Sequence, residues 1–180
     1  NAYPVEHCFE TPHLHVLNER HIALDGVRVE TESTRPAVVR VRTTADKGDV
    51  SVEIVRDGRT VASGEGRDIV LEIPDGELWS PENPALYEAR VELPDLDKVL
   101  DQRTVRFGIR KLEWDTDGLF VNGESVKLRG GCIHSDNGIL GAADVREASY
   151  RKVALLKRWG FNAIRSAHNP LSKSMLDERG

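Results

Sequence analysis

The sequence predicts a mixed fold, in which an antiparallel β-sandwich is followed by a strand–helix–strand unit. About seven short runs with apolar and polar alternation occupy the middle of the chain, and turn residues separate them. Strands at this spacing are typical of an immunoglobulin-like sandwich. After Trp114 the pattern changes to a hairpin, a loop, an amphipathic helix and a short apolar run. That order indicates a βαβ unit with a parallel strand pair.

The sandwich strands are expected at seven places between Ile22 and Ile109. They are residues 27–31, 38–42, 50–55, 60–62, 69–73, 86–93 and 103–109. Asp57-Gly58 separates the third run from the fourth and is a strong hairpin signal. A Cys–Trp–Cys arrangement is absent from the sequence, so an antibody-like domain is excluded.

The second region begins with a predicted hairpin. Asn122-Gly123 joins the apolar runs 119–121 and 126–128, and this dipeptide favours a type I′ turn. Residues 129–134 continue from the hairpin as the next strand. A further strand is expected over residues 161–164, because a short apolar run follows a helix pattern there.

The helix between these two strands has predicted ends. Asp144 is the expected N-cap, with Glu147 completing a capping box, and Gly160 is the expected glycine after the last turn. One apolar face is formed by four residues, Ala148, Val153, Leu156 and Trp159. We expect Trp79, Trp114 and Trp159 to serve packing rather than ligand binding, since large aromatic side chains usually pack.

Composition excludes several classes of protein. The chain has 180 residues with a formal net charge of −5, which argues against a nucleic-acid partner. No apolar stretch approaches the roughly 20 residues that span a bilayer, so no membrane contact is expected. Cys8 and Cys132 lack metal-site spacing and are expected to be free thiols, which favours a reducing, cytoplasmic location.

Polar residues follow the last predicted strand, in the segment 162–170, NAIRSAHNP. In α/β architectures the carboxyl end of a strand is where ligands bind. Arg165 and His168 therefore suggest a site for a hydroxyl-rich or anionic ligand. The histidines within residues 1–20 form no comparable pattern, and a solvated tail is the simpler interpretation of that segment.

Three ordered motifs resemble glycoside hydrolase family 2, and most of all its β-galactosidase branch. They are LWSPENPALY at 78–87, FGIR at 107–110 with Asn122-Gly123 and residues 128–130 (LRG) downstream, and NAIRSAHNP at 162–170. The resemblance implies a domain order for this chain. Residues 1–20 would end a preceding jelly-roll domain, residues 21–109 would form the immunoglobulin-like sandwich, and residues 110–180 would begin a (β/α)8 barrel that is truncated here.

The same resemblance implies a retaining glycosidase that cleaves terminal β-glycosides, with β-galactosides as the expected substrates. The family's two catalytic glutamates follow later barrel strands, so we expect no catalytic residue in this chain. The residues expected to bind the sugar are His134, Asp136, Arg165, His168 and Asn169. Asn169 stands where many relatives have tyrosine, and Cys132 stands where many have asparagine.

Each assignment has a structural alternative. His134 and His168 could satisfy loop backbone groups, Arg165 could form an ion pair inside the barrel, and Asp136 could serve a tight turn. A non-catalytic module that binds carbohydrate or protein is the alternative to an enzyme, and β-glucuronidase or β-mannosidase activity is the related alternative. No metal site or cofactor is identifiable, although a divalent cation in the whole enzyme and a homo-oligomer both remain open.

Overall fold

A computed structural model describes residues 24–45, 48–95, 98–134, 136–143, 145–168, 170–172 and 175–176 of the chain. The chain divides into two units. Among the described residues, the first unit ends at Lys127 and the second begins at Leu128. The predicted tail at residues 1–20, with Cys8 and its histidines, lies outside the described part.

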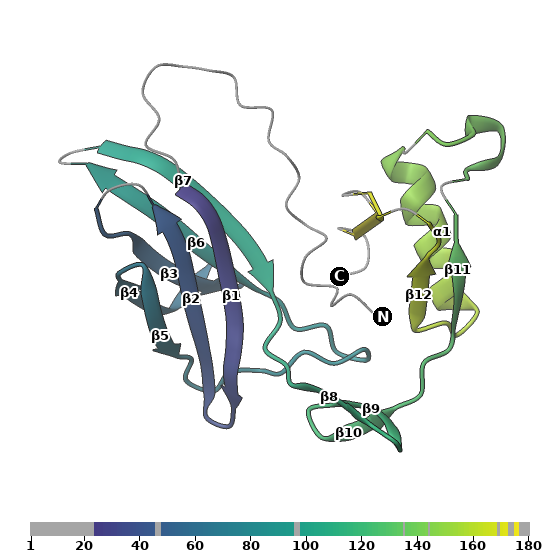
Figure 1. The fold of residues 1–180 in the computed structure, drawn as a ribbon, viewed down its shortest axis with the longest axis horizontal. Helices are drawn as coiled ribbons and strands as arrows, with labels where there is room; N and C mark the ends of the chain where they lie inside the picture. Colours follow the sequence, from purple (N-terminus) through teal and green to yellow (C-terminus); the bar gives the residue numbers. More distant parts are fainter. Residues whose placement is uncertain are drawn as a thin grey trace. The chain divides into compact units, whose positions relative to one another are not determined.

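The first unit contains the predicted sandwich, built from two antiparallel sheets (Figure 1). One sheet has the order β1 (Leu24–Thr34), β2 (Ala37–Ala45), β5 (Asp68–Glu72). The other has the order β4 (Arg59–Glu65), β3 (Ser51–Arg56), β6 (Tyr87–Asp95), β7 (Lys98–Phe107). All seven predicted strands are therefore present, and most are longer than their apolar runs.

The core of the sandwich lies between these sheets and is formed by alternate residues of the strands. In β2 the buried positions are spaced by two, so Val39 and Val41 face inward and Arg40 and Arg42 face solvent. Burial of such aliphatic side chains stabilises each by about 1.5–3 kcal/mol relative to exposure. The same alternation buries Val52 and Ile54 of β3, and Ala89, Val91 and Leu93 of β6.

Both predicted tight turns form. Asp57 and Gly58 have φ values of 49° and 76° and join β3 to β4. Asn122 and Gly123 have φ values of 54° and 83°, as a type I′ turn requires. This second turn joins β9 (Gly118–Val121) to β10 (Glu124–Val126), and β8 (Leu112–Asp115) pairs with β9.

The small sheet β10–β9–β8 belongs to the same unit as the sandwich, which extends to Lys127. The domain boundary after residue 109 stays a prediction. Asn122 joins the small sheet to the sandwich, because its side-chain amide donates to the Trp79 carbonyl at 3.0 Å and its Oδ1 accepts from the Lys111 amide at 2.9 Å. The Arg110 guanidinium lies 4.4 Å from the Trp79 ring centroid, so Trp79 is the packing anchor that we expected.

A buried tyrosine fastens the irregular segment before β6 to the sandwich. The Tyr87 hydroxyl accepts a hydrogen bond from the Glu77 amide at 2.7 Å and another from Arg56 Nη1 at 3.2 Å. The Glu77 carboxylate also accepts hydrogen bonds from the Arg56 guanidinium and from the Asn83 side-chain amide. These two hydrogen bonds, of which the one from Arg56 has the larger effect, hold the pKa of the Glu77 carboxyl below its ordinary value. Side-chain hydrogen bonds thus hold this segment on the sandwich, although it forms no strand.

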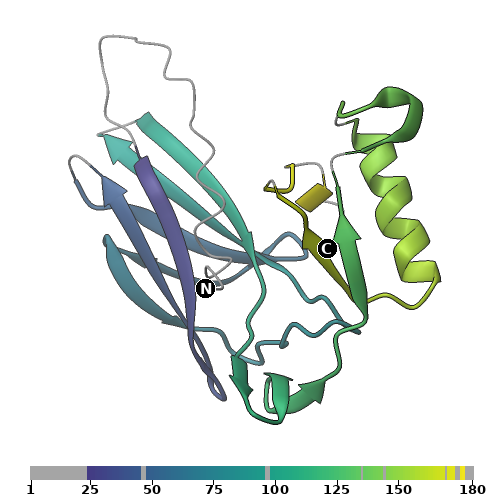
Figure 2. The same ribbon diagram turned by 45° about the vertical axis from the view of Figure 1, so that its right-hand side comes forward.

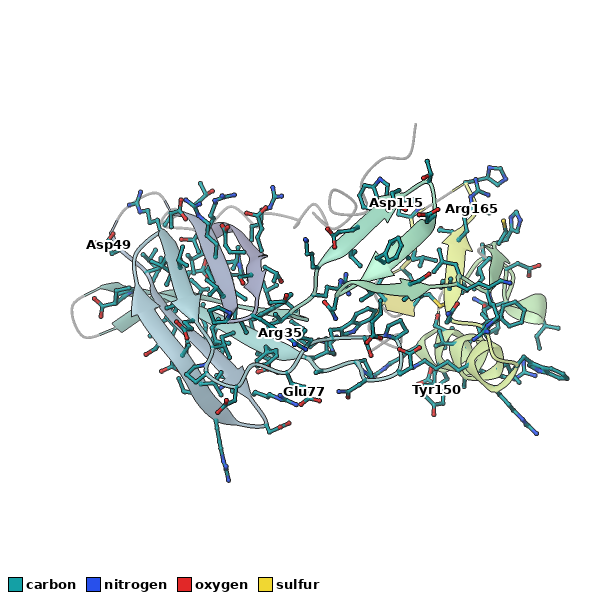
Figure 3. All side chains as sticks on the ribbon, turned by 90° about the horizontal axis from the view of Figure 1, so that it is seen from below. Arg35, Asp49, Glu77, Asp115, Tyr150 and Arg165 are labelled. Carbon is teal, nitrogen blue, oxygen red and sulfur yellow. The ribbon has the colours of Figure 1, made fainter. Side chains whose placement is uncertain are left out.

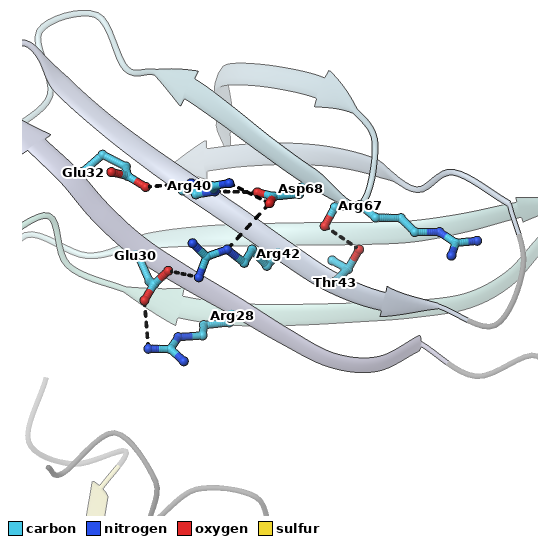
Figure 4. A network of polar contacts seen from close by, with 8 residues as sticks. All are labelled: Arg28, Glu30, Glu32, Arg40, Arg42, Thr43, Arg67 and Asp68. Atoms are coloured by element: carbon cyan, nitrogen blue, oxygen red, sulfur yellow. Dashed lines mark hydrogen bonds and ion pairs between the residues drawn. The ribbon is translucent and has the colours of Figure 1, made fainter.

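Charged side chains cover the solvent face of β1, β2 and β5 as a continuous network (Figure 4). Arg40 donates to both carboxylate oxygens of Asp68, at 2.6 and 2.7 Å, and Arg42 joins Asp68 to Glu30. The hydrogen bonds from Arg40, followed by its charge and that of Arg42, lower the pKa of Asp68. Residues of opposite charge therefore lie next to each other on neighbouring strands of this face.

The second unit contains the predicted βαβ arrangement. Its elements are β11 (Gly130–Ile133), the short 3₁₀ helix η2 (Gly138–Leu140), α1 (Arg146–Arg158) and β12 (Ala163–Ser166). β11 and β12 pair in parallel, as predicted, and α1 runs alongside the pair (Figures 1 and 2). No helix in the described part of the chain has the length and apolar character needed to cross a membrane.

The two ends of α1 differ in how well the sequence predicted them. Gly160 has φ 78°, its amide donates to the Lys157 carbonyl, and the Phe161 amide donates to the Leu156 carbonyl, both at 3.0 Å. This is a complete Schellman motif, so the predicted end is confirmed. At the other end, the expected N-cap Asp144 lies outside the described residues, and the residue before the helix is Val145, whose side chain makes no capping bond.

The predicted apolar face of α1 is only partly buried. Val153 is buried and so is Ser149, which the hydrophobic pattern does not include. Trp159 is 78% exposed, so its assignment to the core is wrong for the part of the chain described. Trp159 lies six residues after Val153, which is about 120° away from it around the helix, so the two do not share a face. Trp114 is similarly exposed.

We expect Tyr87→Phe to destabilise the chain by about 1–3 kcal/mol, because the Glu77 amide and the Arg56 guanidinium lose a shared acceptor at a buried position. Urea unfolding measures the change. Tyr150→Phe is the matched control, since Tyr150 is an exposed tyrosine of α1 (Figure 3). Equal stability of the two variants would contradict the role assigned to the Tyr87 hydroxyl.

The charge network makes a pH-dependent contribution to stability. Because the folded-state pKa of Asp68 is lowered, its ion pair stabilises the fold above the unfolded-state pKa of about 4 and loses that effect as the pH falls through the folded value. Asp68→Asn should therefore differ from wild type at neutral pH and converge with it in acid. Unfolding midpoints across pH test this expectation. Asp49→Asn, at an exposed aspartate outside the charge network, should change the unfolding midpoints little at any pH.

Candidate sugar-binding edge

The candidate site is built on the parallel pairing of β11 and β12. Cys132 pairs with Arg165 and Ile133 pairs with Ser166, so the two strands end side by side. The Ala167 amide extends the pairing by donating to the Ile133 carbonyl at 2.9 Å. Because the strands run in the same direction, the residues that follow them emerge at one edge. His134 and His168, which are far apart in the sequence, therefore both lie at the carboxyl edge of the β11–β12 pair.

The start of this pair depends on a glycine. A Cβ atom on Gly130 would lie 2.3 Å from the Ala163 carbonyl oxygen and 2.8 Å from its carbonyl carbon. Both are backbone atoms of the partner strand, so no side-chain movement could relieve the clash. The Arg129 backbone amide donates to Asn162 Oδ1 at 2.7 Å. The Asn162 backbone amide in turn donates to the Arg129 carbonyl at 3.0 Å. These contacts fix the register from which the site is built.

The two faces of the strand pair have different surroundings. Ile133 and Ser166 line a cavity of about 50 Å³ together with Ser149 and Lys152 of α1, so these residues face the helix. Side chains alternate along a strand, which puts Cys132 and Arg165 on the opposite face. Figure 3 labels Arg165 beside β12 and Tyr150 beside α1. Arg165 is exposed on its face, and its Nη1 donates to Cys132 Sγ at 3.4 Å.

His134 and His168 lie against each other at the carboxyl edge. Their ring centroids are 5.6 Å apart and the rings are tilted by 45°. Both side chains are exposed, and His134 also lines the cavity beside α1. His168 has a φ of 67°, a left-handed conformation that costs a non-glycine residue energy and often occurs at functional sites. The structure thus brings together two of the five predicted sugar-binding residues in direct contact.

Asp136 is used by its own loop. Its Oδ1 accepts a hydrogen bond from the Gly138 amide at 2.9 Å, the pattern of a tight turn that its sequence context also favoured. The side chain is exposed, and its second oxygen has no hydrogen-bond partner within the described residues. Asp136 can therefore form the turn with one carboxylate oxygen and offer the other oxygen to a ligand. Asn169, the fifth predicted residue, lies outside the described residues.

Lys152 is a residue that the sequence did not single out. Its ammonium group donates to the carbonyl oxygens of His134, at 3.5 Å, and of Asp136. The loop after β11 is thereby fastened to α1. The sequence feature that could have identified Lys152 is its place next to Val153, near the helix face that carries Ser149 and Val153 and packs on the strands. No group of three or more metal-binding side chains occurs in the parts of the chain that the structure describes.

Comparison with known proteins gives consistent matches. Residues 5–110 match the family described as "Glycosyl hydrolases family 2". A putative β-glucuronidase of Formosa agariphila is 41% identical over 62% of this chain. A β-galactosidase of Bacteroides ovatus is 32% identical over 87% of it.

Solved structures match over a similar extent. A glycosyl hydrolase family 2 member from Bacteroides cellulosilyticus is 36% identical, covers 88% of this chain and has a TM-score of 0.79. A β-glucuronidase from Ruminococcus gnavus is 26% identical, covers 86% of this chain and has a TM-score of 0.79. These matches account for 23% and 27% of those longer chains. The sequence matches likewise span 11% of the Formosa protein and 21% of the Bacteroides ovatus protein.

We expect Gly130→Ala to destabilise the β11–β12 pair by about 1–3 kcal/mol or more, because the added methyl group meets the backbone of Ala163. Hydrogen exchange of the β12 amides and urea unfolding measure this effect. Gly131→Ala is the matched control, since a Cβ there meets no atom within 4 Å. Similar exchange rates in both variants would refute the close approach at Gly130.

Proposed function

Since the chain belongs to glycosyl hydrolase family 2, we propose that it is part of a retaining glycosidase that cleaves terminal β-glycosides. The relatives named above include β-galactosidases and β-glucuronidases. The observation that carries the proposal for this chain is the polar edge of the β11–β12 pair. It has two adjacent imidazole rings, and the Arg165 guanidinium lies on one face of the same strand pair, against Cys132. All three side chains are exposed.

We assign residues 21–109 to an immunoglobulin-like spacer and residues 110–180 to the beginning of a (β/α)8 barrel. Parallel strands are stable when both faces are covered, and α1 covers one face of the β11–β12 pair. In a barrel the other face, which carries Cys132 and Arg165, points to the interior. The carboxyl ends of the strands then form the mouth where substrates bind, which is the edge that carries the two histidines.

The chemistry of this edge suits a saccharide. An imidazole can both donate and accept hydrogen bonds, as sugar hydroxyl groups require. The rings of His134 and His168 lie close enough to contact neighbouring hydroxyls of one sugar. The Arg165 guanidinium has five N–H donors and can orient a catalytic carboxylate while keeping it ionised. We assign no residue of this chain as the acid/base or the nucleophile.

β-Galactosides are the substrates we propose first, because a β-galactosidase matches the longer part of the chain. The relatives named β-glucuronidase favour a β-glucuronide as the second candidate. Glucuronides need a cation near the sugar carboxylate, and Arg165 is an exposed cation on the strand face. The same guanidinium could thus serve a catalytic carboxylate or a substrate carboxylate, and substrate preference separates the two roles.

We expect the whole protein to hydrolyse nitrophenyl β-galactoside faster than nitrophenyl β-glucuronide. Arg165→Ala should lower kcat/KM by about 100-fold or more, the usual effect of removing a charged donor from a transition state. His168→Ala should lower it by about 10-fold or more, as loss of a sugar hydrogen bond would. Initial rates with both substrates measure these effects, and circular dichroism checks that each variant is folded.

Arg158→Ala is the matched control for Arg165→Ala. Arg158 is an exposed arginine at the end of α1, and β12 begins shortly after it, so it belongs to the opposite end of the strand pair. Its kcat/KM should stay within about twofold of wild type. If Arg165→Ala and Arg158→Ala behave alike, Arg165 is not part of the site. Absence of hydrolysis of every nitrophenyl glycoside would favour the non-catalytic binding module.

A further inference from the structure

The Arg165 guanidinium is oriented by a neutral group. Its Nη1 donates to Cys132 Sγ at 3.4 Å, and no carboxylate of the described residues forms an ion pair with it. Several other arginine side chains are paired with acids, as Arg40 is with Asp68 and Arg56 is with Glu77. Arg165 differs from these two, because no carboxylate of the described residues matches its positive charge.

We propose that Cys132 is a positioning residue for Arg165, which holds the guanidinium on the open strand face without neutralising its charge. The inference rests on the proposed function, in which that charge acts on a carboxylate or a sugar. Cys132 and Arg165 are register partners of the parallel pair, so the contact crosses between adjacent strands. The backbone pairing that Gly130 permits thus determines where the guanidinium lies.

A thiol suits this role for two reasons. Its sulfur is a weak, uncharged acceptor, so it takes one N–H group of the guanidinium and leaves the positive charge available. The remaining four of the five donors can then bind a ligand in a planar, bidentate geometry. A carboxylate at the same place would compete with the ligand for the guanidinium fork, and an alanine would offer no acceptor.

Three substitutions at position 132 separate these effects. Cys132→Ser keeps a small neutral acceptor, and its kcat/KM should stay within about twofold of wild type. Cys132→Ala removes the acceptor and should lower kcat/KM by about fivefold or more, mainly through kcat if Arg165 acts in the transition state. Cys132→Asp should lower it further than alanine does, because the new carboxylate captures Arg165.

A double substitution tests whether the effect runs through the arginine. In an Arg165→Lys background, Cys132→Ala should cause no further loss beyond about twofold, since the bond it removes is already absent. Cys8→Ala exchanges the other cysteine of the chain and is the matched control, with unchanged rates. Equal rates of wild type and Cys132→Ala, or equal losses in the serine and alanine variants, would overturn the proposal.

Crystal structures of the wild type and the variants give a second measurement that does not need activity. The guanidinium should keep its place in Cys132→Ser, leave it in Cys132→Ala and pair with the new carboxylate in Cys132→Asp. If wild-type protein hydrolyses no nitrophenyl glycoside, the proposed function fails, and these structures still decide the positioning role. An Arg165 side chain in the same place in all variants would refute it.

Discussion

The parallel pairing of β11 with β12 is the constraint on which the candidate site depends. The pairing needs a glycine at position 130, where a Cβ would strike the Ala163 carbonyl. With the register fixed, His134 and His168 meet at one edge and Cys132 meets Arg165 on one face. No residue of this group would meet another through local sequence alone, since the strands are separated by a loop and a helix. The chemistry of the edge is thus a consequence of backbone geometry.

The sandwich is held by a different kind of interaction. Its core is aliphatic and follows from simple alternation along the strands, whereas its irregular segments are fastened by single polar residues. Tyr87 holds the segment before β6, and Asn122 holds the small sheet through the Trp79 carbonyl. These residues lie at places where the backbone has few partners in a strand. They explain why the motif around Trp79 needs both large aromatic and polar residues.

The sequence predicts those parts of the fold whose causes are local. Alternating strands, Asn122-Gly123 and the Gly160 helix end were all foreseeable, because each depends on neighbouring residues. The meeting of His134 and His168 was foreseeable only from the parallel pairing. The roles of Lys152 and of the Cys132 thiol were not, since both depend on contacts between elements. Trp159 was expected on the buried face of α1 but is exposed, because it lies about 120° from Val153 around the helix.

The solvent face of β1, β2 and β5 has a consequence for long-range electrostatics. Its arginines at positions 28, 40 and 42 form ion pairs with Glu30, Glu32 and Asp68, so these six charges balance one another. The excess of acidic over basic residues in the chain therefore comes from residues outside this network. A balanced network projects little field beyond a Debye length, so it contributes little to the attraction or repulsion of charged molecules at a distance.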